Sequence, residues 1–375
     1  GSFEAIAPPD NCVTLYDRPS YATWVRGSYT RTYIFGGNSA NLVFTEHKKL
    51  LRLSIAAPTN PIVSGSGTGN EIGITTTGTG LTGNYIFAIR WRDSIHGRRS
   101  PLSAPSPTLA LVNQNVALNN LPLGPTPTDS GVDVLEVWAS QDGGLFRHLA
   151  SRDIGATSIT IYETVAGEAE TSDLQAFPLC KYGRIYHDQL VMAGDARHPD
   201  RVYFSIIGSP EEYEGLWIAT RNGEPVIGLY VIRDILIVQC HNSHYYVQGF
   251  DASDITMNTL EPFIGGLGHH TVVLLDRYAI FPARTGLYLC NGTSITLISQ
   301  KFSITWAEEE HWIKYNTGPG QDGWCMHDIE DKLIKYKAPR GSVLSPRLGL
   351  QSVNGYTAQN NIIWVLDYSG LVDSN

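Results

Sequence analysis

Apolar runs separated by short polar turns recur along the second half of the chain. The turns fall at Asp188, Arg233 and Asp276, with successive spacings of 45 and 43 residues. Each unit reads as a strand, a polar turn, an apolar strand, a loop and an aromatic strand, as in 182–205. A repeat of about 40–50 residues that carries several strands is typical of a β-propeller blade. The pattern therefore predicts an all-β chain of blade-like units.

The same alternation predicts strands outside these three units. They are expected at Tyr29–Phe35, Leu42–Phe44 and Leu50–Leu53, and more weakly at Lys332–Tyr336 and Asn361–Asp367. The repeat length and the residues available then correspond to about six blades. A single short helix is expected at Ile304–Tyr315, with Ser303 as its N-cap.

A different composition interrupts the blade pattern after residue 55. Residues 58–81 are rich in Gly, Ser and Thr, and six to seven short strands follow, beginning with 83–91. Many short strands without a cysteine pair are typical of a fibronectin-type-III-like sandwich. We expect a propeller formed by residues 1–55 and 175–375, with the sandwich inserted at 56–174, since insertion is tolerated where chain ends lie close together.

Composition and charge narrow the function. Charged residues make up only 17% of the chain and the net charge is −9, without a basic run longer than two residues. A tight nucleic-acid binder normally carries a basic stripe. No apolar stretch approaches the length of a membrane span, and no signal peptide is visible. The five unpaired cysteines are expected to be reduced, which fits assembly in a cytoplasm.

Candidate chemistry is sparse, and we predict no catalytic, cofactor-binding or metal-binding residue. The pairs His241/His244 and His269/His270 are interpreted as polar loop histidines, because neither pair has a carboxylate at ligand spacing. Ser140–Phe146 approaches the Asp box of sialidase-type propellers but is better explained as a hairpin turn. We expect three carboxylate runs to be solvated rather than catalytic: Glu211–Glu212, Glu308–Glu310, and Asp328 with Glu330–Asp331. The protein is therefore expected not to be an enzyme.

Residues 182–302 resemble one family, the tail-nozzle or tail stabilisation (tubular) proteins of short-tailed bacteriophages and prophages. The matching motifs are Gly183–Tyr186, Leu190–Asp195, His198–Ser205, Gly208–Tyr213, Gly223–Leu229, Gly265–Gly268, Thr285–Tyr288 and Asn291–Gly292. The predicted insert also fits, through Gly83–Ala88 and the hairpin between Trp138 and Phe146. Together these motifs span about two thirds of the chain, and all of them are turn and strand motifs.

The resemblance implies a structural virion protein without a cofactor. It implies a homo-oligomeric ring, a hexamer in the family, below the portal and adaptor of the phage tail. Such a ring lines the DNA ejection channel, helps retain the genome, and contacts the adaptor and the tail fibre or needle proteins. Double-stranded DNA would pass through the lumen without specific binding, and the protein would be assembled in the bacterial host cytoplasm. The alternative left open is an extracellular carbohydrate-binding or carbohydrate-cleaving propeller with an accessory sandwich.

Overall fold

The structure, a computed structural model, is almost entirely β. It describes residues 15–37, 40–126, 128–162, 167–171, 173–249, 251–275, 277–299, 324–328, 332–338 and 362–367. Apart from one short 3-10 helix, η1 (His269–Thr271), the regular elements in these residues are strands, so the all-β prediction is confirmed. No helix in this part of the chain is long and apolar enough to cross a membrane. The helix expected at 304–315 lies outside the described residues.

Five small antiparallel sheets carry the repeat, and in each the strands pair in chain order. The first contains β1 (Leu15–Arg26), β2 (Tyr29–Gly37), β3 (Leu42–Phe44) and β4 (Leu50–Arg52). The second contains β12 (Tyr182–Tyr186), β13 (Gln189–Ala193), β14 (Arg201–Phe204) and β15 (Trp217–Ala219). The third contains β16 (Val226–Ile232), β17 (Ile235–Cys240), β18 (His244–Gln248) and β19 (Thr256–Glu261). The fourth contains β20 (Val273–Leu275), β21 (Tyr278–Ala283), β22 (Gly286–Cys290) and β23 (Ile295–Leu297), and the fifth contains β24 (Trp324–Asp328), β25 (Leu333–Ala338) and β26 (Ile362–Asp367).

The predicted turns are two-residue hairpins between the first two strands of a sheet. His187 and Asp188 have φ of 45° and 61°, and Arg233 and Asp234 have φ of 47° and 62°. Positive φ at both central residues is the geometry whose twist matches that of the flanking strands. Asp276 itself lies outside the described residues, but Leu275 pairs with Tyr278, so that hairpin loop has the same length. The observed period is therefore the spacing of equivalent hairpins.

Consecutive sheets pack face to face, with an apolar layer between each pair. In β13 every residue is buried, and Leu190 and Met192 pack toward the first sheet while Val191 and Ala193 pack toward the third. Because side chains alternate along a strand, a strand covered on both faces reads as an unbroken apolar run. The other two layers are formed by Tyr230, Ile237, Phe281 and Tyr288, and by Val273, Ile280, Leu287 and Ile334.

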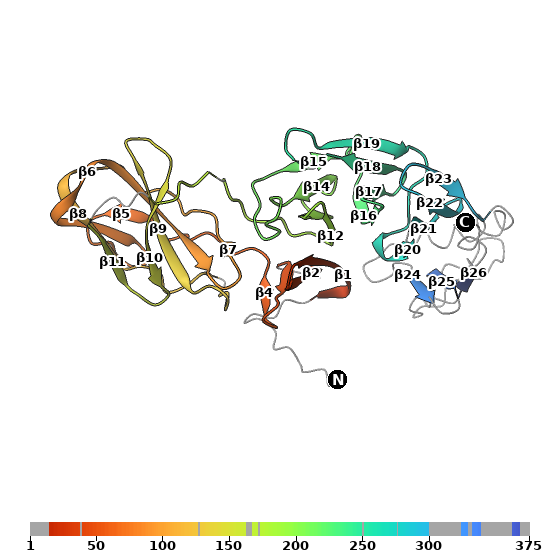
Figure 1. Ribbon diagram of the computed structural model, residues 1–375, viewed down its shortest axis with the longest axis horizontal. Helices are drawn as coiled ribbons and strands as arrows, with labels where there is room; N and C mark the ends of the chain where they lie inside the picture. Colours follow the sequence, from red (N-terminus) through yellow and green to blue (C-terminus); the bar gives the residue numbers. More distant parts are fainter. Residues whose placement is uncertain are drawn as a thin grey trace, which may run out of the picture.

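The first strands of the sheets lie toward one another, and the arrangement is β-propeller-like. Strand β1 contacts β12, β12 contacts β16, and β20 contacts β24. Figure 1 shows the β12, β16 and β20 sheets following one another in an arc, with the β1 and β24 sheets below them. The described residues contain five such sheets, whereas the sequence predicts about six blades.

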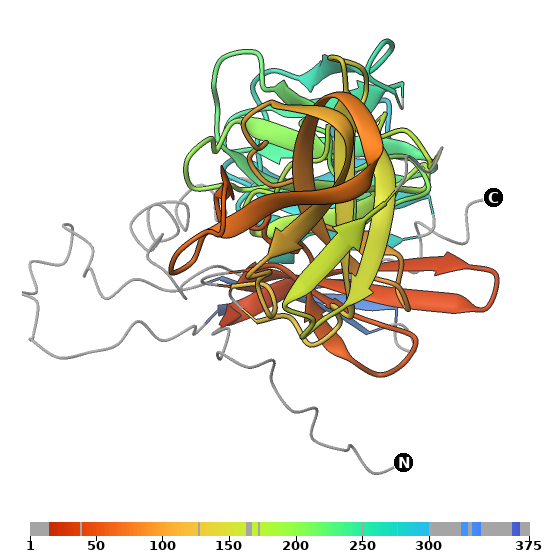
Figure 2. The same cartoon turned by 90° about the vertical axis from the view of Figure 1, so that its left-hand side faces the viewer.

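A separate, larger sheet lies between β4 and β12 in the chain. Its seven strands are β5 (Ile62–Ser64), β6 (Ile72–Asp93), β7 (Arg98–Arg99), β8 (Leu109–Asn119), β9 (Val134–Gln141), β10 (Arg147–Asp153) and β11 (Ser158–Ile161). The central path is β10-β9-β6-β8-β11, and only the β5–β6 pair is parallel among the described strands. The sheet curls around a core of its own, which includes Phe87, Trp91 and Val137. It stands to one side of the other sheets in Figure 1, and its curl faces the viewer in Figure 2.

The curl of this sheet depends on the glycine-rich segment before the predicted strand 83–91. The strand begins earlier than predicted, at Ile72, and runs for 22 residues. Its pairing with β8 shifts register between Thr77 and Leu81 and again before Gly83, and Gly78 has a φ of 64°. Glycines with positive φ permit such bulges, which bend a strand. The early half of β6 therefore pairs with β8 and the late half with β9.

Candidate functional site

A buried serine–histidine contact links the first and third small sheets through η1. Ser20 Oγ lies 3.0 Å from His269 Nε2, and the backbone N–H of Leu229 donates to His269 Nδ1 over 3.2 Å. Because Nδ1 accepts, the proton of the neutral ring is on Nε2, which donates to Ser20. Burial, the charge of Arg184 and the neighbouring His270 hold the pKa of His269 well below its usual range. In this arrangement the imidazole donates to the serine, and it joins β1, β16 and η1.

The prediction that the paired histidines are polar loop residues is wrong for His244 and His269, which are both buried. His244 begins β18, its Nδ1–H donates to the carbonyl of Ile264 over 2.7 Å, and its ring lies 4.5 Å from that of Phe281. Burial lowers the pKa of His244 to about 4. Among the described residues no group of three His, Cys, Asp or Glu side chains could hold a metal ion.

Replacing His244 by phenylalanine is expected to flatten the pH dependence of stability between pH 6.5 and pH 4. The unfolded chain takes up a proton on His244 near pH 6.5, whereas the folded chain does so only near pH 4, so acid favours unfolding within this window. The pKa difference corresponds to about 3 kcal/mol. Urea unfolding of both proteins at a series of pH values measures the effect. Equal slopes in the two proteins would contradict a buried neutral His244, and His269 is expected to preserve part of the slope in the variant.

The carboxylate run Glu211–Glu212 is also not solvated, contrary to the prediction, because both residues are only 8% exposed. They follow β14 and lie where the seven-stranded sheet meets the first and second small sheets. Each is paired with an arginine from another part of the chain: Glu211 with Arg31, and Glu212 with Arg99. A buried carboxylate persists only where it is paired and hydrogen-bonded, which explains both arginines. Of the other predicted runs, 308–310 and 330–331 lie outside the described residues.

One group of buried charges, the Arg31 cluster (Arg31, Tyr33, Glu46 and Glu211), belongs to the small sheets. Arg31 binds Glu46 through Nε at 3.0 Å and Nη2 at 3.1 Å, and Glu211 through Nη1 at 2.8 Å. The Tyr33 hydroxyl donates to Glu211 over 2.7 Å. Burial opposes the charge on Arg31, but the hydrogen bond to Glu46 and the charge of Glu211 outweigh it and raise the pKa of Arg31. Burial and Glu211 likewise raise the pKa of Tyr33.

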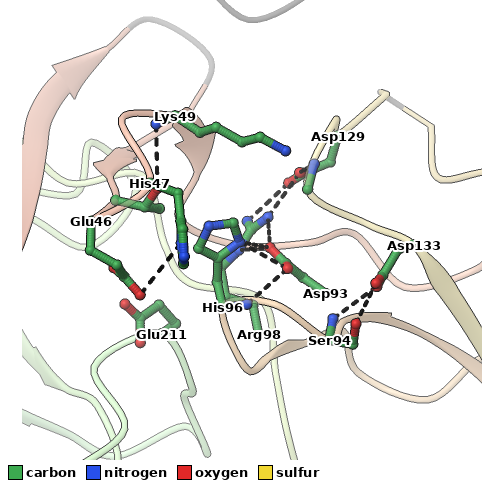
Figure 3. Close-up of polar contacts among 12 residues, drawn as sticks. Glu46, His47, Lys49, Asp93, Ser94, His96, Arg98, Asp129, Asp133 and Glu211 are labelled. Atoms are coloured by element: carbon green, nitrogen blue, oxygen red, sulfur yellow. Dashed lines mark hydrogen bonds and ion pairs between the residues drawn. The ribbon is translucent and has the colours of Figure 1, made fainter. Parts of the chain in front are cut away.

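A second group, the Arg98 cluster (Asp93, His96, Arg98 and Asp129), belongs to the seven-stranded sheet. Arg98 Nη2 lies 2.7 Å from Asp93 and 2.9 Å from Asp129, and His96 Nδ1 lies 2.8 Å from Asp93. Burial lowers the pKa of Arg98, but its bonds to Asp129 and Asp93 raise it more, so the guanidinium stays charged. Gly131 leaves room for it, since a Cβ there would lie 2.3 Å from Arg98 Nη2. Figure 3 shows Glu46 and His47 on one side of His96 and Arg98, and Asp129 on the other.

Three hydrogen-bonded contacts join the seven-stranded sheet to the small sheets and form what we call the seam; the first of them links the two clusters directly. Arg31 Nη2 donates to the carbonyl of His96 over 3.0 Å, and Arg98 Nη1 donates to the carbonyl of Arg52 over 2.6 Å. Arg99 binds Glu212 with two nitrogens, at 2.5 and 3.0 Å, and this pair raises the pKa of Arg99. Planar bidentate pairs fix direction as well as distance. The carboxylates are thus paired with guanidinium groups, and these pairs hold the two bodies together.

Deleting residues 58–172 and joining the ends with a short Gly/Ser linker is expected to leave a folded array of small sheets. The Arg31 cluster keeps all its internal pairs in this variant, and the seven-stranded sheet has its own core. Closing the chain costs only loop entropy, which grows slowly with length. Cooperative urea unfolding followed by tryptophan fluorescence would support this expectation, whereas a gradual transition would contradict it. Glu212, which loses Arg99, is best changed to Gln in the same variant.

Comparison with known proteins gives no family. No protein-family model matches the chain, and no curated protein matches it either. Solved structures with some similarity to this chain include Hsv2 of Kluyvelomyces marxianus, at 9% identity and a TM-score of 0.28, and KlHsv2 with loop 6CD replaced by a Gly-Ser linker, at 4% identity and a TM-score of 0.27. Each alignment covers 61% of this chain and 56%, just over half, of the other. At these TM-scores the similarity assigns neither a family nor a function.

Proposed function

We propose that this protein is a structural component of the tail of a short-tailed bacteriophage, with copies arranged as a ring around the DNA ejection channel below the portal and adaptor. In this proposal residues 1–55 and 175–375 form a propeller of about six blades, and 56–174 form an inserted fibronectin-type-III-like domain. The ring helps retain the packaged genome, and the insert projects toward a neighbouring ring, a tail fibre or a needle protein.

The observation that carries the proposal is the resemblance of residues 182–302 to the tail-nozzle family. Its motifs fall on elements that set the shape of the sheets: Gly183–Tyr186 lies in β12, and Leu190–Asp195 includes most of β13. Tyr203 in β14 donates to Asp195 over 2.9 Å, so two of the motifs are joined directly. These contacts stabilise a scaffold, and function then depends on what the scaffold surrounds.

The charge of the chain supports a lumen through which DNA slides. With 36 acidic and 27 basic residues, the protein releases few counterions on meeting DNA. An acidic wall repels phosphate, whereas a basic wall would hold the DNA and slow its passage. A ring also requires each copy to use two different surfaces repeated by rotation. A surface with few charges suits such contacts, because interface cores are depleted of charge.

Free double-stranded DNA is expected to bind this protein weakly and with a small salt dependence. Few Lys and Arg side chains are available to displace condensed counterions, so the slope of log K against log salt is expected to be shallow. Fluorescence anisotropy with a labelled duplex at several salt concentrations measures it. Tight binding with a steep slope would contradict a sliding channel.

The ring itself is tested by electron microscopy of the protein mixed with the other tail proteins of its phage. Rings or partial tails are expected, and particles that lack the protein should package DNA but lose it or fail to eject it. A chain that stays monomeric with all its tail partners would overturn the proposal. So would hydrolysis of a glycan that a single Asp or Glu substitution abolishes, which is the outcome expected for the alternative, a carbohydrate-cleaving propeller.

A further inference from the structure

We propose that a crevice beside the seam binds a single neutral saccharide unit, a role separate from ring formation. The crevice has a volume of about 360 Å³ and lies between the seven-stranded sheet and the segment that follows β14. That volume is at the lower end of the range of small-molecule sites, which often lie between domains. Six charged side chains line it, namely Arg90, Arg92, Arg99, Glu136, Glu168 and Glu212.

The inner wall of the crevice is built before any ligand arrives. Glu136, whose side chain is 2% exposed, accepts hydrogen bonds from Arg90 Nε at 2.7 Å, Arg92 Nη1 at 2.9 Å and Trp138 Nε1 at 3.1 Å. The guanidinium of Arg90 lies 4.0 Å above the Trp138 ring. Burial opposes the charge of Glu136, but the bonds to Arg90 and Arg92 outweigh it and lower the pKa of Glu136. A wall fixed in this way loses little conformational entropy on binding.

The outer wall keeps hydrogen-bonding groups available. Arg99 uses Nε and Nη2 for its side-chain hydrogen bonds, both of which go to Glu212. The Arg92 side chain is 47% exposed and uses only Nη1, which donates to Glu136. Nη1 of Arg99 and the other two nitrogens of Arg92 make no side-chain hydrogen bond to the described residues, so they can donate to a ligand, and the exposed Glu168 carboxylate can accept. Planar forks of donors and acceptors match the neighbouring hydroxyl groups of a sugar ring, because each hydroxyl both donates and accepts.

The charge of the walls selects a neutral ligand. Three arginines stand against the carboxylates of Glu136, Glu168 and Glu212, and Arg90 also pairs with Glu170. These carboxylates would repel an anion and the arginines would repel a cation, and the repulsion is strong because the distances are short and the crevice partly excludes water. The Trp138 ring is buried beneath Arg90, so the crevice offers hydrogen bonds rather than an apolar subsite. This disfavours a peptide side chain and favours a polyhydroxylated ligand.

Saturation-transfer NMR and calorimetry on the full chain test the site with a charge-matched series: glucose, galactose, mannose and N-acetylglucosamine as neutral probes, glucuronate as the anion, and glucosamine as the cation. Binding of at least one neutral sugar is expected, tighter than that of either charged relative. Arg92→Ala and Glu168→Gln should each weaken it by about tenfold. Arg152→Ala, an exposed change on β10 at a residue that does not line the crevice, should leave it unchanged.

Three results would overturn the proposal. One is no binding of any neutral sugar, and another is tighter binding of glucuronate or glucosamine than of glucose. The third is neutral-sugar binding that neither Arg92→Ala nor Glu168→Gln alters. Thermal unfolding of each variant confirms that it is folded, and Glu168→Gln, at an exposed position, keeps the test available if Arg92→Ala is not. Ring assembly is measured separately, so the failure of one proposal leaves the other standing.

Discussion

Replacing Arg98 by methionine is expected to lower the free energy of unfolding by about 3–5 kcal/mol, because it leaves buried carboxylates without their cation. The Arg98 side chain is 1% exposed, and its partners Asp93 and Asp129 are 0% and 2% exposed. Methionine fills similar space, so the loss reports on charge rather than on a cavity. The carbonyl of Arg52 loses a donor at the same time. Urea unfolding near neutral pH measures the change.

A matched pair of variants separates charge from packing in that experiment. Arg152→Met removes an exposed arginine from β10 and is expected to change stability by less than about 0.5 kcal/mol. The triple variant Arg98→Met, Asp93→Asn, Asp129→Asn removes the three charges but keeps oxygen acceptors for the N–H groups of His96 and Gly131, and it should recover part of the lost stability. A loss below about 1 kcal/mol for Arg98→Met alone would contradict a buried, paired Arg98.

Replacing Leu236 by alanine is expected to lower the free energy of unfolding by about 2–5 kcal/mol, the usual cost of truncating a buried leucine. Leu236 is fully buried in β17 and packs in the layer between the second and third small sheets. Its strand pairs on both sides, with Val231 of β16 and Val247 of β18, so the surrounding residues cannot easily collapse into the space.

Leu274→Ala is the control for that prediction. Leu274 is 42% exposed in β20, and the same truncation there should cost less than about 1 kcal/mol. Equal losses at the two positions would contradict the packing of β17 between two sheets. Both variants can be followed by tryptophan fluorescence during urea unfolding.

The seam makes the seven-stranded sheet a body with a defined direction relative to the small sheets. Each cluster pairs most of its own charges internally, and the contacts described above join the seven-stranded sheet to the small sheets. A sheet with its own core, held at a fixed angle by directional hydrogen bonds, is suited to project from the small sheets and present one face to a partner. In the ring that we propose, the seam would set the angle at which the insert leaves the propeller.

Local features of the sequence were sufficient to place most strands. The strand predicted at Leu42–Phe44 is β3, the apolar run Ile235–Val238 lies within β17, and the run 361–367 contains β26. The hairpins at Asp188 and Arg233 were equally predictable. Alternation, apolar runs and turn residues act between near neighbours, so they can be read without knowing the fold. The predicted hairpin after Ser140 is likewise a turn, with Asp142 at a φ of 49°.

The sequence did not predict the early half of β6, because its local composition is typical of a loop. Residues 72–82 are rich in Gly and Thr, a composition that reads as a loop. Here the glycines occupy bulges in a strand that is paired along its length, and pairing with β8 decided the outcome. Long-range pairing therefore overrode the local preference.

The amino-acid sequence by itself determined the all-β class, the hairpin spacing and the apolar layers, because these depend on periods of two residues and on turn chemistry. Only the tertiary structure decided which polar residues are buried. Arg31 meets Glu211 across 180 residues of chain, and His269 meets Ser20 across 249. No local pattern identifies such partners, because a carboxylate run on the surface and one paired with a buried guanidinium can have the same local sequence. Burial and pairing are properties of the assembled sheets. For this reason the sequence suggested polar, solvated positions for Glu211, Glu212, His244 and His269, whereas the structure buries all four.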